Sequence, residues 1–193
     1  MKLSPLATLG AIGVEPARVE HVVLTHLHYD HAGNLPGFPA ATFVVHEEEL
    51  AFWTGRHAGR GEMGALMEAD DVAHLVLANF AGRVRFVGRD AAVLPGLSVH
   101  HVGGHSPGLI VVKVVTAEDS CVLASDATHF YANIEADRPF SKVHSLPQMY
   151  DAFDTVNELA GAPERVVPGH DPLVMERYPA AAGDLEGLVA RIA

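Results

Sequence analysis

Residues 25–31, with the sequence THLHYDH, place three imidazoles and one carboxylate within a few positions of one another. They directly follow the apolar run HVVL, which is typical of a buried strand. A continuous strand would put His26, His28 and Asp30 on one face and His31 on the other, whereas a turn after His28 would direct two pairs of side chains toward neighbouring points. Imidazole and carboxylate groups bind zinc and related transition ions. The segment therefore predicts a fold built around a metal site.

Three further residues of the same chemical kind follow apolar runs later in the chain. His105 stands in GGHSPG, Asp126 in ASDAT and His170 in VVPGHDP. Loops at the ends of strands are where a rigid scaffold presents functional groups. Each residue taken alone would be read as a cap or a surface residue. Together with the early cluster they make four groups of donors at strand ends, which chance explains poorly.

The motif HLHYDH resembles the HxHxDH signature of the metallo-β-lactamase superfamily, and the three later residues match that family's later His, Asp and His. The resemblance runs in order over nearly the whole chain. It implies an α+β fold, a four-layer αβ/βα sandwich, in a single domain over residues 1–193. It also implies two Zn²⁺ ions as cofactors, although other divalent transition metals suit the same ligands. The implied ligands are His26, His28 and His105 for one ion, Asp30, His31 and His170 for the other, and Asp126 as a bridge between them.

The resemblance further implies a hydrolase in which two cations share a water and lower its pKa toward neutrality. Asp30 would then carry a proton to the leaving group. The stretches FPAATFVVHEEELAFW and GGHSPGL resemble the N-acyl-homoserine lactone lactonases, which act in quorum quenching. Those enzymes place a Tyr three residues after the bridging Asp, to hold the lactone carbonyl. Here His129 occupies that position and Tyr131 follows it, and either side chain can donate a hydrogen bond to a developing oxyanion.

Two other functions remain open at this point. Hydroxyacylglutathione hydrolases, the glyoxalase II type, share all the ligand types but need a basic patch, for which Arg138 and Lys142 are the candidates. A non-catalytic metal-binding or structural relic is the second alternative, because only 25 residues precede His26. The family places several strands before this motif, so we expect a sandwich that lacks its N-terminal strands. A fragment, a misassigned start or a partner covering the exposed sheet edge would each account for that.

Composition narrows the class of partner. The formal net charge is −11 and no basic stripe offsets it, which disfavours nucleic acid. No apolar run reaches the length of a membrane helix and no signal-peptide pattern is present, so we expect no membrane partner and a cytoplasmic location. The partner we expect is a small-molecule lactone or ester, and a homodimer is left open.

Apolar patterning predicts strands and helices in alternation. The expected strands are 21–25, 41–46, 83–87, 97–102, 109–116, 121–125 and 165–167. The expected helices are 3–12, 47–54, 70–81, 147–160 and 184–192, with Asp70 or Asp71 as the N-cap of the third. The aromatic pair Phe52 and Trp53 is expected in the core more than in a substrate wall. Structural or solvent roles are expected for His21, His46, His57, His74, His100, His101 and His144.

Overall fold

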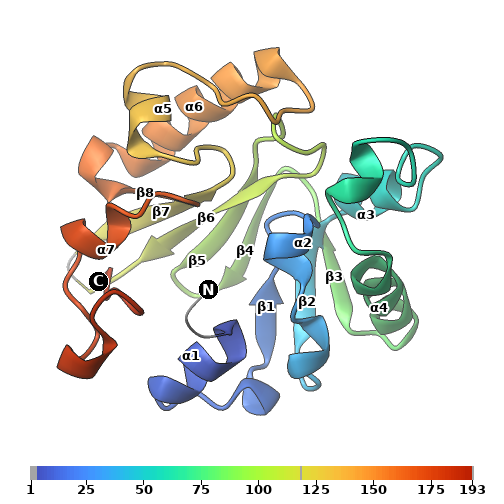
Figure 1. The fold of residues 1–193 in the computed structure, drawn as a ribbon, viewed down its shortest axis with the longest axis horizontal. Coiled ribbons are helices and arrows are strands. Elements are labelled where there is room, and N and C mark those ends of the chain that lie inside the picture. Colours follow the sequence, from blue (N-terminus) through green and yellow to red (C-terminus); the bar gives the residue numbers. More distant parts are fainter. Residues whose placement is uncertain (1–3, 118, 193) are drawn as a thin grey trace.

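Two β-sheets pack face to face in the computed structural model, which describes residues 4–117 and 119–192 (Figure 1). The first sheet is parallel and has the order β1-β2-β3, whereas the second has the order β4-β5-β6-β7-β8 and is antiparallel except for its β7–β8 pair. The first sheet comprises β1 (His21–Val23), β2 (Thr42–His46) and β3 (Val84–Val87). The second comprises β4 (Asp90–Leu94), β5 (Leu97–His101), β6 (Ile110–Val115), β7 (Ser120–Ser125) and β8 (Val166–Pro168).

The helices that the structure describes are α1 (Pro5–Ala11), α2 (Tyr29–Ala32), α3 (Glu47–Trp53), α4 (Ala69–Phe80), α5 (Tyr131–Glu135), α6 (Leu146–Ala160) and α7 (Val174–Arg177). Of these, α3 and α4 pack against the first sheet and α6 packs against the second. The longest, α6, packs on the second sheet through one apolar stripe that includes Ala152, Val156 and Ala160. It ends at Gly161, which adopts the left-handed conformation that commonly terminates helices. Among the described helices none combines the length and apolarity that crossing a membrane requires.

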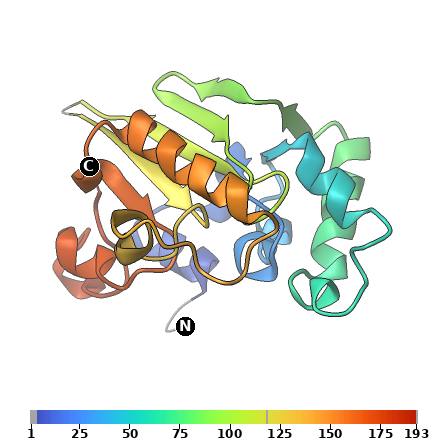
Figure 2. The same ribbon diagram turned by 90° about the horizontal axis from the view of Figure 1, so that it is seen from above.

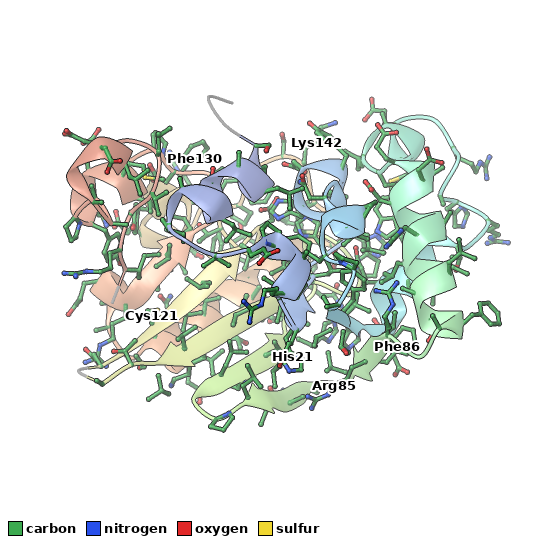
Figure 3. All side chains as sticks on the ribbon, turned by 90° about the horizontal axis from the view of Figure 1, so that it is seen from below. His21, Arg85, Phe86, Cys121, Phe130 and Lys142 are labelled. Atoms are coloured by element: carbon green, nitrogen blue, oxygen red, sulfur yellow. The ribbon has the colours of Figure 1, made fainter. Side chains whose placement is uncertain are left out.

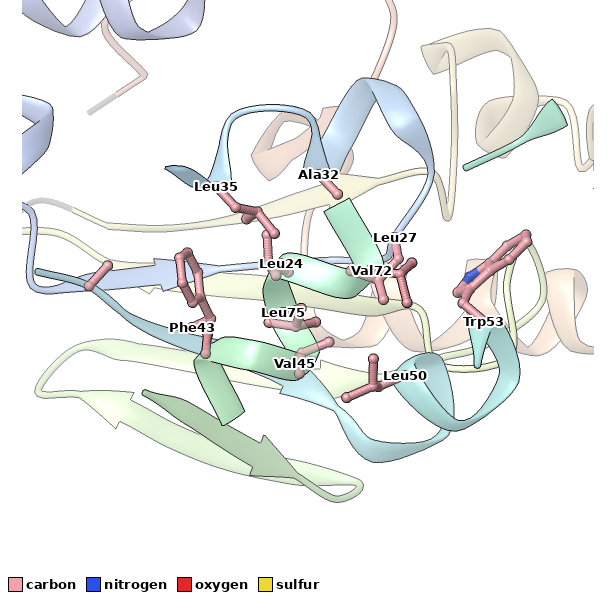
Figure 4. Packing of buried hydrophobic residues seen from close by; sticks show 12 residues of the cluster. Leu24, Leu27, Ala32, Leu35, Phe43, Val45, Leu50, Trp53, Val72 and Leu75 are labelled. Carbon is pink, nitrogen blue, oxygen red and sulfur yellow. The ribbon is translucent and has the colours of Figure 1, made fainter. Parts of the chain in front are cut away.

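Three clusters of buried apolar residues fill the spaces between the layers. One lies between the first sheet and helices α3 and α4 and includes Phe43 and Leu75 (Figure 4). A second fills the space between the sheets and includes Val44 and Val99, and a third lies between the second sheet and α6. Figure 2 shows α6 lying across the second sheet, with α4 on the other side of the molecule. This arrangement confirms the expected four-layer sandwich, and the first sheet, which has three strands, is the smaller of the two.

Most expected elements are present with ends shifted by one or two residues, but two expectations were wrong. The helix over 184–192 does not form; the segment holds a 3-10 turn at Gly183–Leu185, and Gly187 takes a positive φ of 68°, which interrupts a helix. Glu68 rather than Asp70 or Asp71 occupies the N-cap position of α4, so both aspartates lie in its first turn. Their carboxylates still interact favourably there with the positive end of the helix dipole. Strand β4 was not expected at all.

The core prediction that follows concerns Phe43, which is fully buried against α4. Replacing it with Ala should lower the free energy of unfolding by about 3–5 kcal/mol, because a cavity is left in a packed layer. Phe80→Ala is the matched control, since Phe80 is 85% exposed and its loss should change stability by less than about 0.5 kcal/mol. Urea unfolding measures both values, and equal effects would contradict the layer assignment.

Candidate metal centre

Seven side chains from four loops meet at one end of the two sheets. Each loop follows the carboxyl end of a strand, namely β1, β5, β7 or β8. Figure 3 shows Phe130 and Lys142, which belong to this end of the molecule, on the opposite side from His21 and Arg85. The residues brought together are the ones predicted from the sequence: His26, His28, Asp30, His31, His105, Asp126 and His170.

The first group of donors consists of three buried imidazoles, those of His26, His28 and His105. The Nδ1 atom of His28 and the Nε2 atom of His105 are 2.9 Å apart. His105 donates its Nδ1–H to the carbonyl of Lys142 at 2.7 Å, which leaves the Nε2 lone pair facing the other two rings. A hydrogen bond of this kind to the second ring nitrogen is the usual device that orients a metal-binding histidine.

The second group is more open to solvent and consists of Asp30, His31 and His170. The Oδ2 atom of Asp30 lies 3.7 Å from Nε2 of both histidines. The Asp30 side chain is 37% exposed, compared with 17% for His31. This group therefore forms the solvent side of the centre.

Asp126 stands between the two groups and turns one oxygen toward each. Its Oδ2 is 3.2 Å from His105 Nε2 and 3.8 Å from His26 Nε2. Its Oδ1 is 3.2 Å from His31 Nε2 and 3.1 Å from His170 Nε2. A single buried carboxylate thus links both sets of donors, which is the geometry of a bridging ligand.

Several of these polar atoms point into the centre without a hydrogen-bond partner. His26 Nε2, His31 Nε2 and Asp126 Oδ1 are buried and unpartnered among the residues that the structure describes. Leaving buried polar atoms unpaired costs free energy, so such atoms need another partner. Donors separated by 3.1–3.8 Å suit cations bound at about 2.0–2.2 Å from each ligand atom. The donor set therefore fits two divalent transition-metal ions.

The protonation states of the first donor group and of Asp126 also suit cation binding. Burial lowers the pKa of His28 to about 4, and burial together with the neighbouring His31 holds the pKa of His26 well below its ordinary value. Burial also lowers the pKa of His105. Burial alone would raise the pKa of Asp126, but the facing imidazoles of His129 and His31 outweigh it and keep that pKa low. Neutral imidazoles beside an ionised carboxylate are the forms that bind metals.

Sequence comparison places the chain in a family. A model of the metallo-β-lactamase superfamily matches residues 2–170. The chain belongs to this superfamily. The four-layer sandwich and the donor-rich loops at its strand ends agree with that membership.

Curated relatives in this superfamily include lactonases. An N-acyl homoserine lactonase of Bacillus thuringiensis is 26% identical over 134 residues, which are 69% of this chain and 48% of that protein. The N-acyl homoserine lactonase AttM of Azorhizobium caulinodans is 28% identical over 186 residues, which are 92% and 68% of the two chains. The chain thus spans about half the length of the Bacillus relative and about two thirds of AttM.

Solved structures share the fold. A quorum-quenching N-acyl homoserine lactone lactonase superposes with a TM-score of 0.67 at 23% identity, over 86% of this chain and 63% of that one. A probable metal-dependent hydrolase from Staphylococcus aureus gives a TM-score of 0.73 at 19% identity, over 86% and 60%. At these identities the likeness shows the metallo-β-lactamase fold.

Glu49 holds two of the donor-bearing loops together, and sequence analysis missed it. The side chain is fully buried, and its carboxylate accepts four hydrogen bonds of 2.7–2.9 Å. One oxygen binds the backbone N–H of Leu27, between His26 and His28, and the indole of Trp53. The other oxygen accepts from two donors in the loop of His105, Ser106 Oγ and Gly108 N.

Close backbone contacts fix the remaining loops. Ser125, directly before the bridging carboxylate, has a φ of 46°, a strained conformation for a residue with a side chain. Its hydroxyl lies 2.8 Å from that of Thr25, which precedes His26, so the first and third loops are hydrogen-bonded to each other. A Cβ on Gly169 would lie 2.8 Å from Asp126 Oδ1, and therefore only glycine fits before His170.

The two residues proposed to assist a carbonyl lie in different places. His129 is in the centre, with its Nε2 3.0 Å from Asp126 Oδ2 and its ring stacked on Phe140 at 3.4 Å. Tyr131 is buried under the guanidinium of Arg177, 3.6 Å from its ring centroid. It lines a separate cavity of about 370 Å³ with residues of α5, α6 and the segment before β8. His129 therefore lies beside Asp126, whereas Tyr131 faces a different cavity.

A cavity of about 260 Å³ opens beside the first donor group, lined in part by His28 and His105. Its walls include the aromatic pair Phe52 and Trp53, which sequence analysis expected chiefly in the core. Trp53 is only 2% exposed and belongs to the first core cluster, so it serves both as core and as wall. The other apolar wall residues are Met63, Leu66, Pro107 and Val143.

The metal-free protein should lose stability as the solution becomes acidic. His28 takes up a proton near pH 6.5 in the unfolded chain but only near pH 4 in the folded one, so protonation favours unfolding between these values. His28 alone contributes on the order of 3 kcal/mol, present above about pH 6.5 and lost as the pH falls toward 4. Urea unfolding in a chelator at several pH values measures this, and His28→Asn should show a shallower pH dependence. An equal pH dependence of the unfolding free energy in the wild-type protein and in His28→Asn would contradict the assignment of this effect to His28.

Glu49→Gln should weaken zinc binding by about 10–100-fold, since Glu49 positions two metal loops. It should also lower the free energy of unfolding by at least about 2 kcal/mol, because the new NH₂ group faces backbone and side-chain donors. Glu47→Gln is the matched control, because Glu47 is exposed in the first turn of the same helix. Competition with a zinc chelator measures the affinities. Wild-type affinity in Glu49→Gln would rule out the positioning role.

Proposed function

We propose that this chain is a two-metal hydrolase that opens the ring of an N-acyl-homoserine lactone. The observation that carries the proposal is the convergence of two donor groups on the shared carboxylate of Asp126. The lactonases among the relatives and the apolar cavity beside the donors support the choice of substrate. A small-molecule substrate and a cytoplasmic location belong to the same proposal.

The cofactors we propose are two zinc ions, held by His26, His28 and His105 on one side and by Asp30, His31 and His170 on the other, with Asp126 shared. When bound, such a pair of cations lowers the pKa of a water molecule and polarises a carbonyl oxygen. In ring opening, the water oxygen bonds to the lactone carbonyl carbon and the ring C–O bond breaks. Asp30 is half-exposed at the solvent side of the centre, and we assign it the transfer of the water's proton to the departing alkoxide.

His129 is the residue we assign to the substrate carbonyl. Its Nε2–H donates to Asp126 Oδ2, and this hydrogen bond would be given up if Asp126 held cations. The N–H is then available to a developing oxyanion, and stacking on Phe140 fixes the orientation of the ring. His129→Phe should therefore reduce kcat while leaving the zinc content unchanged. Steady-state kinetics and metal analysis of the same preparation test this.

The cavity also bears on the thioester alternative. Lys142 lines it and is the basic residue that a glutathione carboxylate would require, but Glu62 lies 3.7 Å away and offsets its charge. The apolar walls formed by Phe52 and Trp53 suit an acyl chain better than a charged tripeptide. A lactone is therefore favoured over S-lactoylglutathione.

The deciding experiment compares lactone, thioester and β-lactam substrates on zinc-loaded protein. We expect opening of a homoserine lactone and no turnover of S-lactoylglutathione; the reverse result would replace the lactonase with a glyoxalase II type enzyme. His26→Ala should remove both bound zinc and activity, because the fully buried His26 belongs to the first donor group. A protein that binds no zinc and turns over no substrate would be the structural relic.

A further inference from the structure

A buried carboxylate that belongs to neither donor group lies directly after His170. The side chain of Asp171 is only 9% exposed, and within the described part of the chain it belongs to none of the groups of donors that could hold a metal ion. It stands in the segment VVPGHDP, where sequence analysis gave it no role. A carboxylate remains buried at low cost only when it is hydrogen-bonded. Its hydrogen-bond partners therefore indicate its role.

Both oxygens of Asp171 accept a hydrogen bond from the backbone. Oδ1 accepts from the N–H of Leu173 at 2.9 Å, in the turn that aspartate commonly forms with the residue two positions later. Pro172 has no N–H, so Leu173 is the first following residue that can donate. Oδ2 accepts from the N–H of Tyr131 at 2.9 Å, 40 residues earlier in the chain. The local turn thus fixes the carboxylate, and its second oxygen reaches another loop.

The long-range hydrogen bond holds the loop between β7 and α5, residues 126–130, which carries Asp126 and His129. Tyr131 is the first residue of α5 and comes two positions after His129. The N–H groups in the first turn of a helix have no partner within the helix, so they bind acceptors from outside it. Asp171 supplies such an acceptor from the loop of His170. One side chain therefore ties the loop of His170 to the loop of the bridging carboxylate.

Backbone hydrogen bonds join the same two loops on the other side of His170. Beyond the end of the β7–β8 pairing, the N–H of Gly169 donates to the carbonyl of Thr128 at 3.0 Å. The N–H of His170 then donates to the carbonyl of His129, also at 3.0 Å. The side chain of Asp171 makes the next contact along the chain. The backbone of His170 is thus fixed both before and after its own position.

The ring of His170 depends on this backbone support more than the rings of the first donor group do. His105 is buried, and a hydrogen bond to the carbonyl of Lys142 orients its ring. The His170 side chain is 36% exposed, and its ring lies against other members of the centre. Its Nε2 is 3.1 Å from Asp126 Oδ1, and its centroid is 4.6 Å from that of His129. A shift of the backbone would therefore move this nitrogen away from the other donors.

We propose that Asp171 is a positioning residue for the second metal ion, and this proposal rests on the two-metal centre of the proposed function. Asp171 fixes the backbone of His170 against the loop that carries Asp126 and His129, so that the donors of the second group meet at one ion. Glu49 makes the equivalent connection between the two loops of the first group. Each donor group then depends on a different buried acid that binds no metal itself.

Zinc titration of the chelator-stripped protein, followed through histidine side-chain nitrogen resonances, tests this role without reference to catalysis. The resonances of His28 report zinc at the first group and those of His170 report zinc at the second. Asp171→Ala removes both acceptors and should weaken zinc binding at the second group by about 100-fold, with the first group unchanged. Asp171→Asn keeps one acceptor oxygen and should lose about tenfold at the second group. Glu49→Gln should show the reverse, with the larger loss at the first group.

The matched control is Asp151→Ala, because Asp151 is exposed on α6 and its loss should leave zinc binding at both groups unchanged. A residue that only stabilised the fold would lower the melting temperature without separating the two groups. Wild-type affinity at the second group in a folded Asp171→Ala, or equal weakening at both groups, would overturn the positioning role. If Asp171→Ala does not fold, the same outcomes in Asp171→Asn decide.

The wild-type protein distinguishes failure of this role from failure of the proposed function. Zinc binding at both groups without opening of a lactone would overturn the lactonase, and the titration of the Asp171 variants would still decide the positioning role. A wild-type protein that binds no zinc would overturn both.

Discussion

The buried carboxylate of Asp126, facing five imidazoles, is the contact on which the rest of the centre depends. Neither the carboxylate nor the unpartnered nitrogens around it could remain buried at low cost without a positive charge between them. The fold meets this demand by ending β1, β5, β7 and β8 at the same side. Loop positions that would otherwise be free to vary are thereby constrained, as the strained Ser125 and the obligatory Gly169 show.

A second buried carboxylate, that of Glu49, supports the centre without belonging to the donor groups. Glu49 binds no substrate atom in our proposal, yet it joins the loop of His26 and His28 to the loop of His105. Its four donors satisfy both of its oxygens, so hydrogen bonds stabilise this acid in its buried position. The two acids have different roles. Asp126 faces the proposed cations, and Glu49 fixes the loops that carry the donor side chains.

How much the sequence predicts depends on whether a residue's neighbours are local. The donor residues were predictable because each follows an apolar strand, and strands that end at one side bring their loops together. Glu49 was not, because HEEE reads as the acidic first turn of a helix and three of its four hydrogen-bond partners lie 22, 57 and 59 residues away. The sequence also did not predict that His129 and Tyr131 lie in different places, because helix α5 begins at Tyr131 and His129 lies outside it. The helix expected at 184–192 failed on a local backbone preference at Gly187.

The proposed ligands are divided between the two halves of the sandwich. Four of them follow β1 in the first sheet, whereas the other three follow strands of the second. Cations held between these groups would link the two halves. The valines packed between the sheets stay buried only while the halves remain in contact. Loss of the metal ions would therefore remove more than activity. It would weaken the association of the two halves, and the exposed apolar core residues would favour aggregation.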